Sequence, residues 1–365
     1  MDKMKRFIDC YVPVTTCNLR CSYCYITQSH AWKNKLPKFK YNPEYIGKAL
    51  SAERLGGICH INMCGGGETL LPPEMTGILR SILEQGHYIM VVTNGTVTKR
   101  FDEIITFPKE LLNHLGFKFS FHYLELLRTD KLNLFFSNVK KVKDAGCSFS
   151  VELTPYDELV PHIDDIQKVC MERIGALCHV TVGRVNDDPS LPILTNNSHN
   201  QYKKIWGVFD SAMFNFKMST FLIKRREYCY AGAWSGLLDL GTGELRPCYQ
   251  ALYSQNIFKN LKKPIKWIPI GCHCSQPHCY NSHSFLTLGV IPSIHTPTYA
   301  EMRDRVSIID HTSWLTPDMA AFLSNKLVNA NPEYTPAQKI ISEISKLPLC
   351  IRNGLYLMKI NIKSK

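Results

Sequence analysis

The alternation of short apolar runs with helical patterns in the first half of the chain is the strongest constraint on its fold. Six runs rich in β-branched and aromatic residues recur at intervals of roughly thirty residues, at Phe7–Val14, Ile58–Cys64, Tyr88–Thr93, Phe117–Phe121, Ser148–Leu153 and Leu177–Val182. Segments between them show the helical period, as in Pro43–Leu55, Pro73–Glu84, Leu132–Ala145 and Asp157–Ile174. Strands that alternate with helices predict parallel βαβ units. We therefore expect an α/β fold whose units form a partial (β/α)6 barrel, an incomplete relative of the eight-unit TIM barrel.

Polar residues end or directly follow each of the predicted strands. Barrels of this class place their active sites at the carboxyl ends of the strands. The residues in these positions are Cys17, Gly66, Gly67, Glu68, Asn94, Ser120, His122, Glu152, Thr154 and Arg184. Because they fall in register over successive strands, we expect them to share one active face.

The composition is that of a soluble globular protein. Of the 365 residues, 45% are hydrophobic and 20% are charged. No apolar run reaches the about 18 residues of a membrane-spanning helix, and the amino-terminal stretch lacks the features of a signal peptide. We expect a cytoplasmic chain whose fifteen cysteines are reduced, so clustered cysteines indicate metal or redox chemistry rather than disulfides.

The chain is basic, since 43 Lys and Arg against 31 Asp and Glu give a formal net charge of +12. This excess favours an anionic partner, such as a phosphorylated small molecule, an acidic peptide, nucleic acid or a membrane surface. The basic residues are spread and form no dense block. Nucleic acid is therefore not the expected partner, and a solvated basic surface is the simpler interpretation.

Three closely spaced cysteines, Cys17, Cys21 and Cys24, lie on the segment after the first predicted strand. A cubane iron–sulfur cluster normally takes four thiolates, so three leave one iron with an open position. An open position distinguishes a catalytic metal site from a structural one. The alternative is a zinc site that a distant Cys or His completes.

The Cys-x3-Cys-x2-Cys spacing, followed by Gly66-Gly67-Glu68 after the second strand, resembles the radical S-adenosylmethionine (SAM) superfamily. The resemblance implies a 4Fe-4S cluster whose unique iron is chelated by SAM, and reductive cleavage of SAM to a 5′-deoxyadenosyl radical that abstracts a substrate hydrogen. It implies an electron donor such as flavodoxin or ferredoxin. It also implies that the glycine turn and Glu68 bind the SAM amino group. The cofactor-binding residues expected in this way are Tyr23, Gly66, Gly67, Glu68, Asn94, Ser120 and Thr154.

A second group of cysteines lies in the carboxyl-terminal half, at Cys229, Cys248, Cys272, Cys274 and Cys279. The segment LLDLGTGELRPC reads as a β-hairpin around Gly241 and Gly243 that delivers Cys248. This part resembles the SPASM and twitch domains, which carry auxiliary clusters. Five thiols cannot fill two closed clusters, so we expect one auxiliary 4Fe-4S cluster on Cys229, Cys248 and two of the remaining three. Structural zinc, helped by His273, His278 and His283, is the alternative.

The rhythm of strands and helices stops after the sixth strand, which suggests four regions. We expect a radical SAM partial barrel over 1–190, a connector over 191–224, a twitch-like or SPASM-like auxiliary domain over 225–285 and a helical carboxyl-terminal extension over 286–365. Helical patterns in the extension cover 300–309, 317–328 and 336–347. We expect the extension to pack on the barrel or the auxiliary domain.

The substrate is the open part of the sequence interpretation. We favour an oxidoreductase-type reaction that oxidises or epimerises a sugar-type small molecule, phosphorylated or nucleotide-linked. Two features support this choice: the cysteine motif begins as early as Cys17, and the number of later cysteines fits one auxiliary cluster. The alternative is a maturase that modifies a peptide or protein, of the RiPP or sulfatase-maturation type. A degenerate metal-binding scaffold is disfavoured because all three cysteines and Glu68 are present. Candidate catalytic groups are His122, Arg184, Cys64 and Tyr249, with Tyr123 and Glu125 as further polar groups, and Cys64 is the thiol that epimerisation would need.

Overall fold

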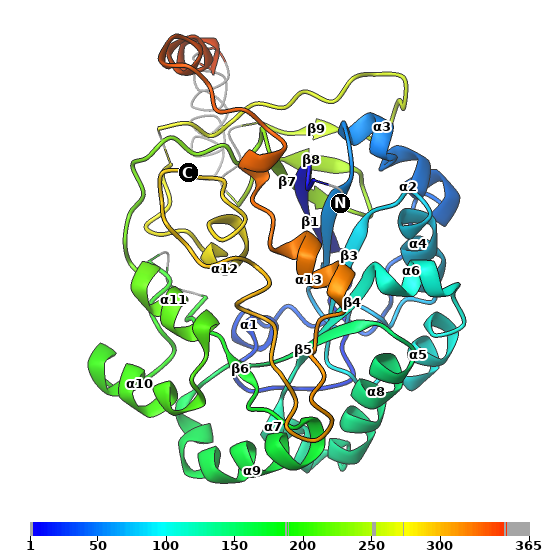
Figure 1. The fold of residues 1–365 in the computed structure, drawn as a ribbon, viewed down its shortest axis with the longest axis vertical. Coiled ribbons are helices and arrows are strands. Elements are labelled where there is room, and N and C mark those ends of the chain that lie inside the picture. Colours follow the sequence, from blue (N-terminus) through cyan, green and yellow to red (C-terminus); the bar gives the residue numbers. More distant parts are fainter. Residues whose placement is uncertain are drawn as a thin grey trace.

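A curved sheet of nine strands organises the computed structural model, which describes residues 3–186, 188, 190–249, 253–272, 274–346 and 348. The strands lie in the order β6-β5-β4-β3-β2-β1-β7-β8-β9, and β1 to β6 are all parallel. Helices surround the outer face of this curved sheet, as Figure 1 shows. The strands are β1 Arg6–Val12, β2 Cys59–Gly65, β3 Tyr88–Thr93, β4 Leu115–Ser120, β5 Ser148–Leu153, β6 His179–Val180, β7 Ser235–Asp239, β8 Glu244–Arg246 and β9 Gln255–Asn256. The predicted partial barrel of six parallel strands is therefore confirmed.

The strand boundaries agree with the sequence prediction to within two residues, except that β6 is shorter. β3 and β5 match completely, whereas β6 covers only His179–Val180 of the predicted Leu177–Val182. β6 lies at the sheet edge and pairs only with β5 among the described strands, at Glu152 and Leu153. A short edge strand exposes few unpaired backbone groups.

The helices follow local signals in the sequence. The predicted helix over 43–55 is split because Ser51 ends the first piece and its side chain accepts a hydrogen bond from the Arg54 amide, which caps the second. The predicted helix over 157–174 begins as a 3-10 turn that contains Pro161, which lacks an amide donor. The helices are α1 Tyr25–Gln28, α2 Pro43–Ala49, α3 Ala52–Leu55, α4 Glu74–Leu83, α5 Thr98–Ile104, α6 Lys109–Asn113, α7 Tyr123–Arg128, α8 Leu132–Asp144, α9 Ile163–Ile174, α10 His199–Trp206, α11 Ala212–Thr220, α12 Ser282–Phe285 and α13 Pro317–Leu323, with 3-10 turns η1 Asp157–His162, η2 Gly207–Phe209 and η3 Leu327–Asn329.

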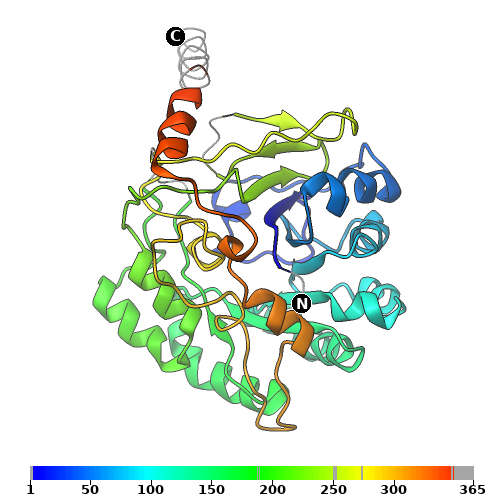
Figure 2. The same cartoon turned by 45° about the horizontal axis from the view of Figure 1, so that its top comes forward.

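The predicted hairpin around Gly241 and Gly243 is observed, and it extends the barrel sheet. β7 pairs in parallel with β1, and β8 returns antiparallel to β7, with Asp239 opposite Glu244. Figure 2 shows β7, β8 and β9 along one edge of the barrel. The cysteine that comes after β8 is therefore fixed relative to the barrel by continuous strand pairing.

The carboxyl-terminal residues pack on the inner face of the sheet. Phe7 and Tyr88, which point inward from β1 and β3, belong to the same buried cluster as Phe285 and Phe322. The rings of Tyr88 and Phe322 stack with centroids 3.8 Å apart. In Figure 1 this part of the chain, in yellow and orange, runs across the open side of the barrel. The expectation that the extension packs on the barrel is confirmed.

The predicted helix over 300–309 is wrong. This segment forms turns and a bridge between Val306 and Ser313. A single turn forms at its start, where Asp304 N donates to Ala300 O at 2.9 Å, and the helix does not continue because Ile308 N donates to Gly175 O at 2.8 Å. Helices do occur at α13 and over 336–346, and Figure 2 shows the latter, in red, projecting from the body.

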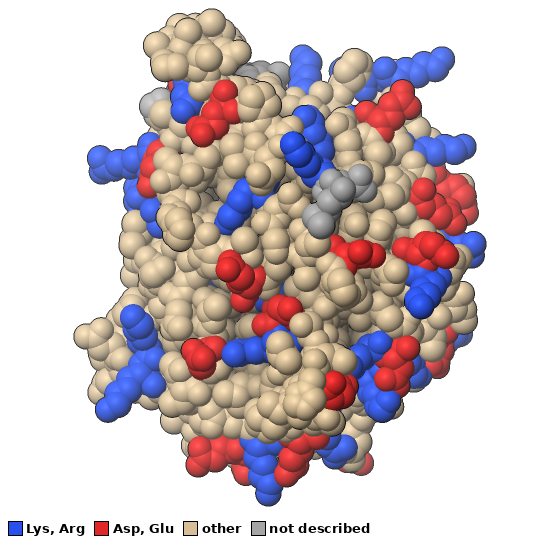
Figure 3. Space-filling view, in the orientation of Figure 1, with Lys and Arg blue, Asp and Glu red and all other residues tan. Residues whose placement is uncertain are grey.

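The surface carries charges of both signs. In Figure 3, Lys and Arg alternate with Asp and Glu over the visible face and form no single-sign block. Within the described part of the chain, no helix has the length and apolar character that a bilayer crossing needs.

Candidate functional site

A cavity of about 600 Å³ lies at the carboxyl ends of β1 to β4. It brings together Cys17, Cys21 and Cys24, the glycine turn after β2 and the residues that end β3 and β4. Its lining includes Cys17, Cys21, Cys24, Cys64, Gly66, Gly67, Glu68, Asn94, Ser120 and His122. The residues expected on the active face at the ends of β1 to β4 therefore line one cavity, whereas Glu152, Thr154 and Arg184 do not line it.

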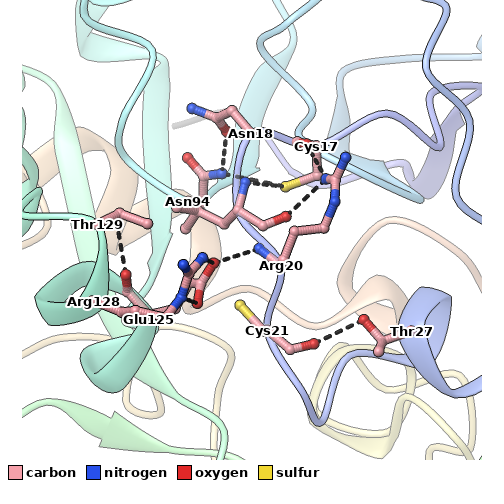
Figure 4. Close-up of polar contacts among 10 residues, drawn as sticks. Cys17, Asn18, Arg20, Cys21, Thr27, Asn94, Glu125, Arg128 and Thr129 are labelled. Carbon is pink, nitrogen blue, oxygen red and sulfur yellow. Dashed lines mark hydrogen bonds and ion pairs between the residues drawn. The ribbon is translucent and has the colours of Figure 1, made fainter.

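Hydrogen bonds from neighbouring elements hold the three-cysteine loop (Figure 4). The Arg20 amide donates to Glu125 Oε1 at 2.6 Å, and Glu125 also pairs with Arg128 on α7. The Asn94 side-chain amide, after β3, lies 3.5 Å from Cys17 Sγ as a donor. Thr27 Oγ1 donates to Cys21 O at 2.8 Å. Asn94 and Glu125 thus position the loop.

The chemistry of the three thiols fits a cluster that leaves one corner open. Burial, and next the Glu68 carboxylate, raise the pKa of the Cys17 thiol to about 11, so iron binding would displace a proton from it. Among the described residues, no three His, Cys, Asp or Glu side chains converge as ligands of one metal ion do. A four-iron cluster does not need its thiolates to converge on one point, because each thiolate binds a different iron.

The glycine turn packs tightly against the segment before Cys17. A Cβ atom on Gly67 would overlap the Thr16 carbonyl oxygen, so only glycine permits this approach. The Glu68 amide donates to the same carbonyl at 3.0 Å. The Tyr25 hydroxyl donates to the Gly66 carbonyl oxygen at 2.8 Å. The turn and the cysteine loop therefore form one structural unit.

Glu68 is 2% exposed and links the ends of two strands. Its Oε1 accepts from Thr93 Oγ1 at 2.7 Å and from Leu70 N at 3.0 Å, and its Oε2 accepts from Asn94 N at 2.7 Å. Burial raises its pKa, although these three bonds act in the opposite direction. A cationic group in the cavity would stabilise this buried carboxylate.

Replacing Glu68 by Gln should weaken SAM binding while the cluster absorption is kept. A hydrogen bond from an ammonium to a carboxylate contributes about 1.5–3 kcal/mol, which is about tenfold to a hundredfold in affinity. Equilibrium SAM binding to anaerobically reconstituted Glu68→Gln measures this loss, and the exposed Glu110→Gln is the control. A lower melting temperature with unchanged SAM affinity would assign Glu68 to holding the turn alone.

The residues expected near SAM do not all lie in the same cavity. Ser120 lines the three-cysteine cavity together with the catalytic candidate His122, whereas Tyr23 lines a neighbouring depression with Tyr156, their ring centroids being 4.2 Å apart and their planes tilted by 30°. The Tyr23 hydroxyl bonds to His122 Nδ1. Burial lowers the pKa of His122 to about 4, so its ring is neutral at pH 7. Thr154 does not line the three-cysteine cavity.

A second cavity, of about 570 Å³, is lined by four cysteines of the carboxyl-terminal group. They are Cys229, Cys248, Cys274 and Cys279. Cys229 forms a backbone bridge with Gly271, and its pKa is raised chiefly by burial and then by the other three thiols. Cys272 is exposed, and its amide donates to Glu343 Oε1 at 3.3 Å. The geometry favours Cys274 and Cys279 as the pair that the sequence left open.

Of the three histidines that could help to bind a structural zinc, His278 is the one that lines the four-cysteine cavity in the described part of the chain. His278 lines the four-cysteine cavity, is 3% exposed, and neither ring nitrogen has a hydrogen-bond partner among the described residues. His283 lies in the next turn of chain and does not line this cavity. His273 lies outside the described residues.

Asp9 and Tyr249 connect the two cavities. The Tyr249 hydroxyl donates to Asp9 Oδ2 at 3.0 Å and accepts from Asn281 Nδ2 at 2.6 Å. Tyr249 lines the four-cysteine cavity, and Cys64, whose thiol pKa is affected by Asp9, lines the other. The sequence interpretation missed Asp9, although a carboxylate inside an apolar strand is a readable signal of a functional position.

Comparison with protein families identifies the part of the chain that carries the first cavity. A family model described as the Radical SAM superfamily matches residues 11–162. Among curated proteins, no sequence matches this chain. Among solved structures, Streptococcus suis SuiB bound to S-adenosylmethionine is similar, with 15% identity and a TM-score of 0.49 over 71% of this chain and 64% of SuiB, so the chain spans less than two thirds of that protein.

Two further structures are similar. They are anSMEcpe with bound AdoMet and the Cp18Cys peptide, with 14% identity and a TM-score of 0.48 over 71% of this chain and 79% of that one, and BtrN in complex with AdoMet and 2-DOIA, with 14% identity and a TM-score of 0.31 over 71% and 84%. The three-cysteine loop and the glycine turn both fall inside the range of the family match. Residues 11–162 of this chain therefore form a domain that belongs to the radical SAM superfamily.

Proposed function

We propose that this chain is a radical SAM enzyme that oxidises or epimerises a sugar-type small molecule with the help of one auxiliary iron–sulfur cluster. The observation that carries the proposal is the convergence of Cys17, Cys21 and Cys24 with Gly66-Gly67-Glu68 on one cavity. The superfamily of the domain implies an enzyme that uses SAM and a 4Fe-4S cluster. An electron donor such as flavodoxin or ferredoxin and a cytoplasmic location belong to the same proposal.

Each part of the first cavity has a role in this proposal. The thiolates of Cys17, Cys21 and Cys24 hold the 4Fe-4S cluster, and Glu68 accepts a hydrogen bond from the SAM ammonium group. Ser120, which ends β4 and lines the cavity, is placed to bond a ribose hydroxyl. When bound, the SAM-chelated cluster supplies the electron that cleaves SAM to methionine and a 5′-deoxyadenosyl radical.

The residues between the cavities bear on the step after hydrogen abstraction. A substrate radical must lose one proton and one electron to complete an oxidation, or regain one hydrogen atom to complete an epimerisation. Asp9, bonded to Tyr249, is a proton acceptor beside the four-cysteine cavity, where Cys229, Cys248 and their neighbours would hold an electron-accepting cluster. Burial, and next Asp9, raise the pKa of Cys64 to about 12, so it keeps the S–H that hydrogen donation needs.

The number of clustered thiols supports a small-molecule substrate over a peptide. Within the described carboxyl-terminal half, the cysteines form one four-thiol cavity. One auxiliary cluster is the count expected for a dehydrogenase or epimerase of small molecules. A peptide or protein maturase is the alternative, and turnover with a mixed substrate pool distinguishes the two.

Turnover in deuterated water should identify the reaction. We expect the reconstituted, dithionite-reduced enzyme to convert a sugar nucleotide from a mixed pool of sugar nucleotides and short peptides, detected by mass spectrometry. A product lighter by two mass units indicates oxidation, and one heavier by one unit indicates epimerisation. Epimerisation should be lost in Cys64→Ala and kept in Cys147→Ala, because Cys147 lines neither cavity. Conversion of a peptide alone would refute the small-molecule proposal.

A further inference from the structure

Four basic side chains lie in the interior of the barrel, near the two cavities. Apolar side chains would normally fill such an interior. They are Lys118, Arg184, Lys217 and Arg303, called here the lumen cations. Lys118, on β4, is 5% exposed, Lys217, on α11, is 6% exposed, and Arg303 is fully buried. Arg184 lies after β6 and is partly buried. Taking a charge out of water costs several kcal/mol unless it is paired, so this group requires an explanation.

Direct contacts link two of the lumen cations through one tyrosine. The Arg303 guanidinium lies 3.5 Å from the centroid of the Tyr299 ring, and Lys118 Nζ lies 3.5 Å from the Tyr299 hydroxyl. Arg303 Nη1 donates to the His283 carbonyl oxygen at 3.3 Å. These cations therefore share one place under the segment that comes after Cys279.

One further lumen cation reaches the same segment directly. Arg184 Nη1 donates to the Tyr280 carbonyl oxygen at 3.2 Å. Lys217 Nζ donates to Thr181 Oγ1, beside β6, at 2.6 Å. Burial, and next the four lumen cations, lower the pKa of His283 well below its ordinary value, which agrees with their lying near this ring.

Carboxylates balance only part of this charge. Arg303 Nε lies 3.4 Å from Glu152 Oε1, and Asp9 is bonded to Asn62 and Tyr249. In the described part of the chain, Lys118, Arg184 and Lys217 have no carboxylate within salt-bridge distance. Lys118 and Arg184 therefore carry their charges without a carboxylate partner among the described residues, while burial lowers the pKa of Lys217 to about 7.

Buried polar groups without partners accompany these charges. Arg303 Nη2 is fully buried and has no hydrogen-bond partner among the described residues. His278, in the wall of the four-cysteine cavity, has no hydrogen-bond partner at either ring nitrogen among these residues, and one of the two carries a donor N–H. A buried donor that makes no hydrogen bond costs about 1–3 kcal/mol of stability. A bound anion with several acceptor oxygens would satisfy both the charge and the donors.

We propose that the lumen cations bind the phosphate group of a phosphorylated small-molecule substrate. A phosphate monoester carries about −1.5 to −2 charges at pH 7 and three acceptor oxygens, so it would neutralise the unpaired Lys118 and Arg184 and give Arg303 Nη2 an acceptor. Lys118 precedes by two residues Ser120, which lines the three-cysteine cavity, and Arg184 bonds to Tyr280, which lines the four-cysteine cavity. This inference rests on the proposed function and adds the substrate class to it.

Binding of glucose 1-phosphate to the anaerobically reconstituted full chain tests the proposal, with glucose and a triglutamate peptide as comparison ligands. We expect glucose 1-phosphate to bind and to raise the melting temperature, while glucose at the same concentration does neither. Lys118→Met and Lys217→Met should each weaken this binding about tenfold to a hundredfold. Lys140→Met, whose side chain is 74% exposed, should keep the wild-type affinity.

Several results would overturn the proposal. They are equal binding of glucose, binding of triglutamate alone, or an affinity for glucose 1-phosphate that neither lysine variant changes. An equally large loss of SAM affinity in both variants would assign the cations to the SAM carboxylate instead. If a variant fails to fold, the wild-type protein tests the proposal alone: glucose 1-phosphate must raise its melting temperature more than glucose does. Wild-type formation of 5′-deoxyadenosine, measured separately, tests the proposed function, so the two failures are distinguishable.

Discussion

Cys21→Ala should reduce 5′-deoxyadenosine formation to background and remove about half of the iron from the reconstituted protein. Cys21 is 7% exposed, lines the first cavity with Cys17 and Cys24, and is fixed through Thr27. Removing one of three thiolates leaves an iron without its protein ligand, and the corner that SAM would chelate is lost with the cluster. The measurement is the dithionite-driven formation of 5′-deoxyadenosine, with iron and sulfide analysis of the same sample.

The matched control for this experiment is Cys147→Ala. Cys147 is 3% exposed and lines neither cysteine cavity, so its replacement removes a buried thiol away from both. We expect this variant to keep both its iron and its SAM cleavage. Undiminished SAM cleavage in Cys21→Ala would contradict the assignment of the three-cysteine loop.

Cys279→Ala and Cys272→Ala should have opposite outcomes, although both remove a cysteine from the same short segment. Cys279 lines the four-cysteine cavity, whereas Cys272 is exposed and lies outside it. We therefore expect Cys279→Ala to fall from about eight irons to about four, with loss of substrate turnover. Cys272→Ala should keep about eight irons.

Metal analysis with electron paramagnetic resonance of the reduced proteins measures this difference. Equal loss of iron in both variants would mean that Cys272 is a ligand and that the geometry of the four-cysteine cavity is misleading. About four irons and one zinc in the wild type would replace the auxiliary cluster by structural zinc, with His278 as an available neighbour. That outcome would leave the first cluster untouched and would remove the electron acceptor from the proposed oxidation.

The strands of the barrel and the first cysteine site were predictable from sequence because their signals are local. Runs such as Tyr88–Thr93 and Ser148–Leu153 are apolar over most of their length and are bounded by turn residues. The Cys-x3-Cys-x2-Cys spacing and the glycine turn each lie within a few residues of chain. Gly95, directly after β3, has a φ of +73°, which favours glycine.

The failures share a cause, which is that the backbone found partners far away in sequence. The segment over 300–309 has a helical pattern, yet the Ile308 amide donates to the Gly175 carbonyl oxygen. β6 is shorter than its apolar run because it lies at the edge of the sheet. A periodic pattern indicates the helix or strand preference of the segment itself. It carries no information about contacts with residues that are distant in sequence.

The sequence by itself determined the superfamily of residues 11–162 and the grouping of its three thiols, because a cysteine motif and a glycine turn at fixed spacing need no knowledge of the rest of the fold. Only the tertiary structure decided which later cysteines share a cavity, since Cys272, Cys274 and Cys279 look alike in the sequence but differ in burial. It also brought Lys118, from β4, and Arg303, from a distant segment, onto the same tyrosine, Tyr299. The physical reason is that the spacing of residues in the sequence fixes their relative positions only within one loop. The curvature of the sheet fixes the relative positions of residues on different loops.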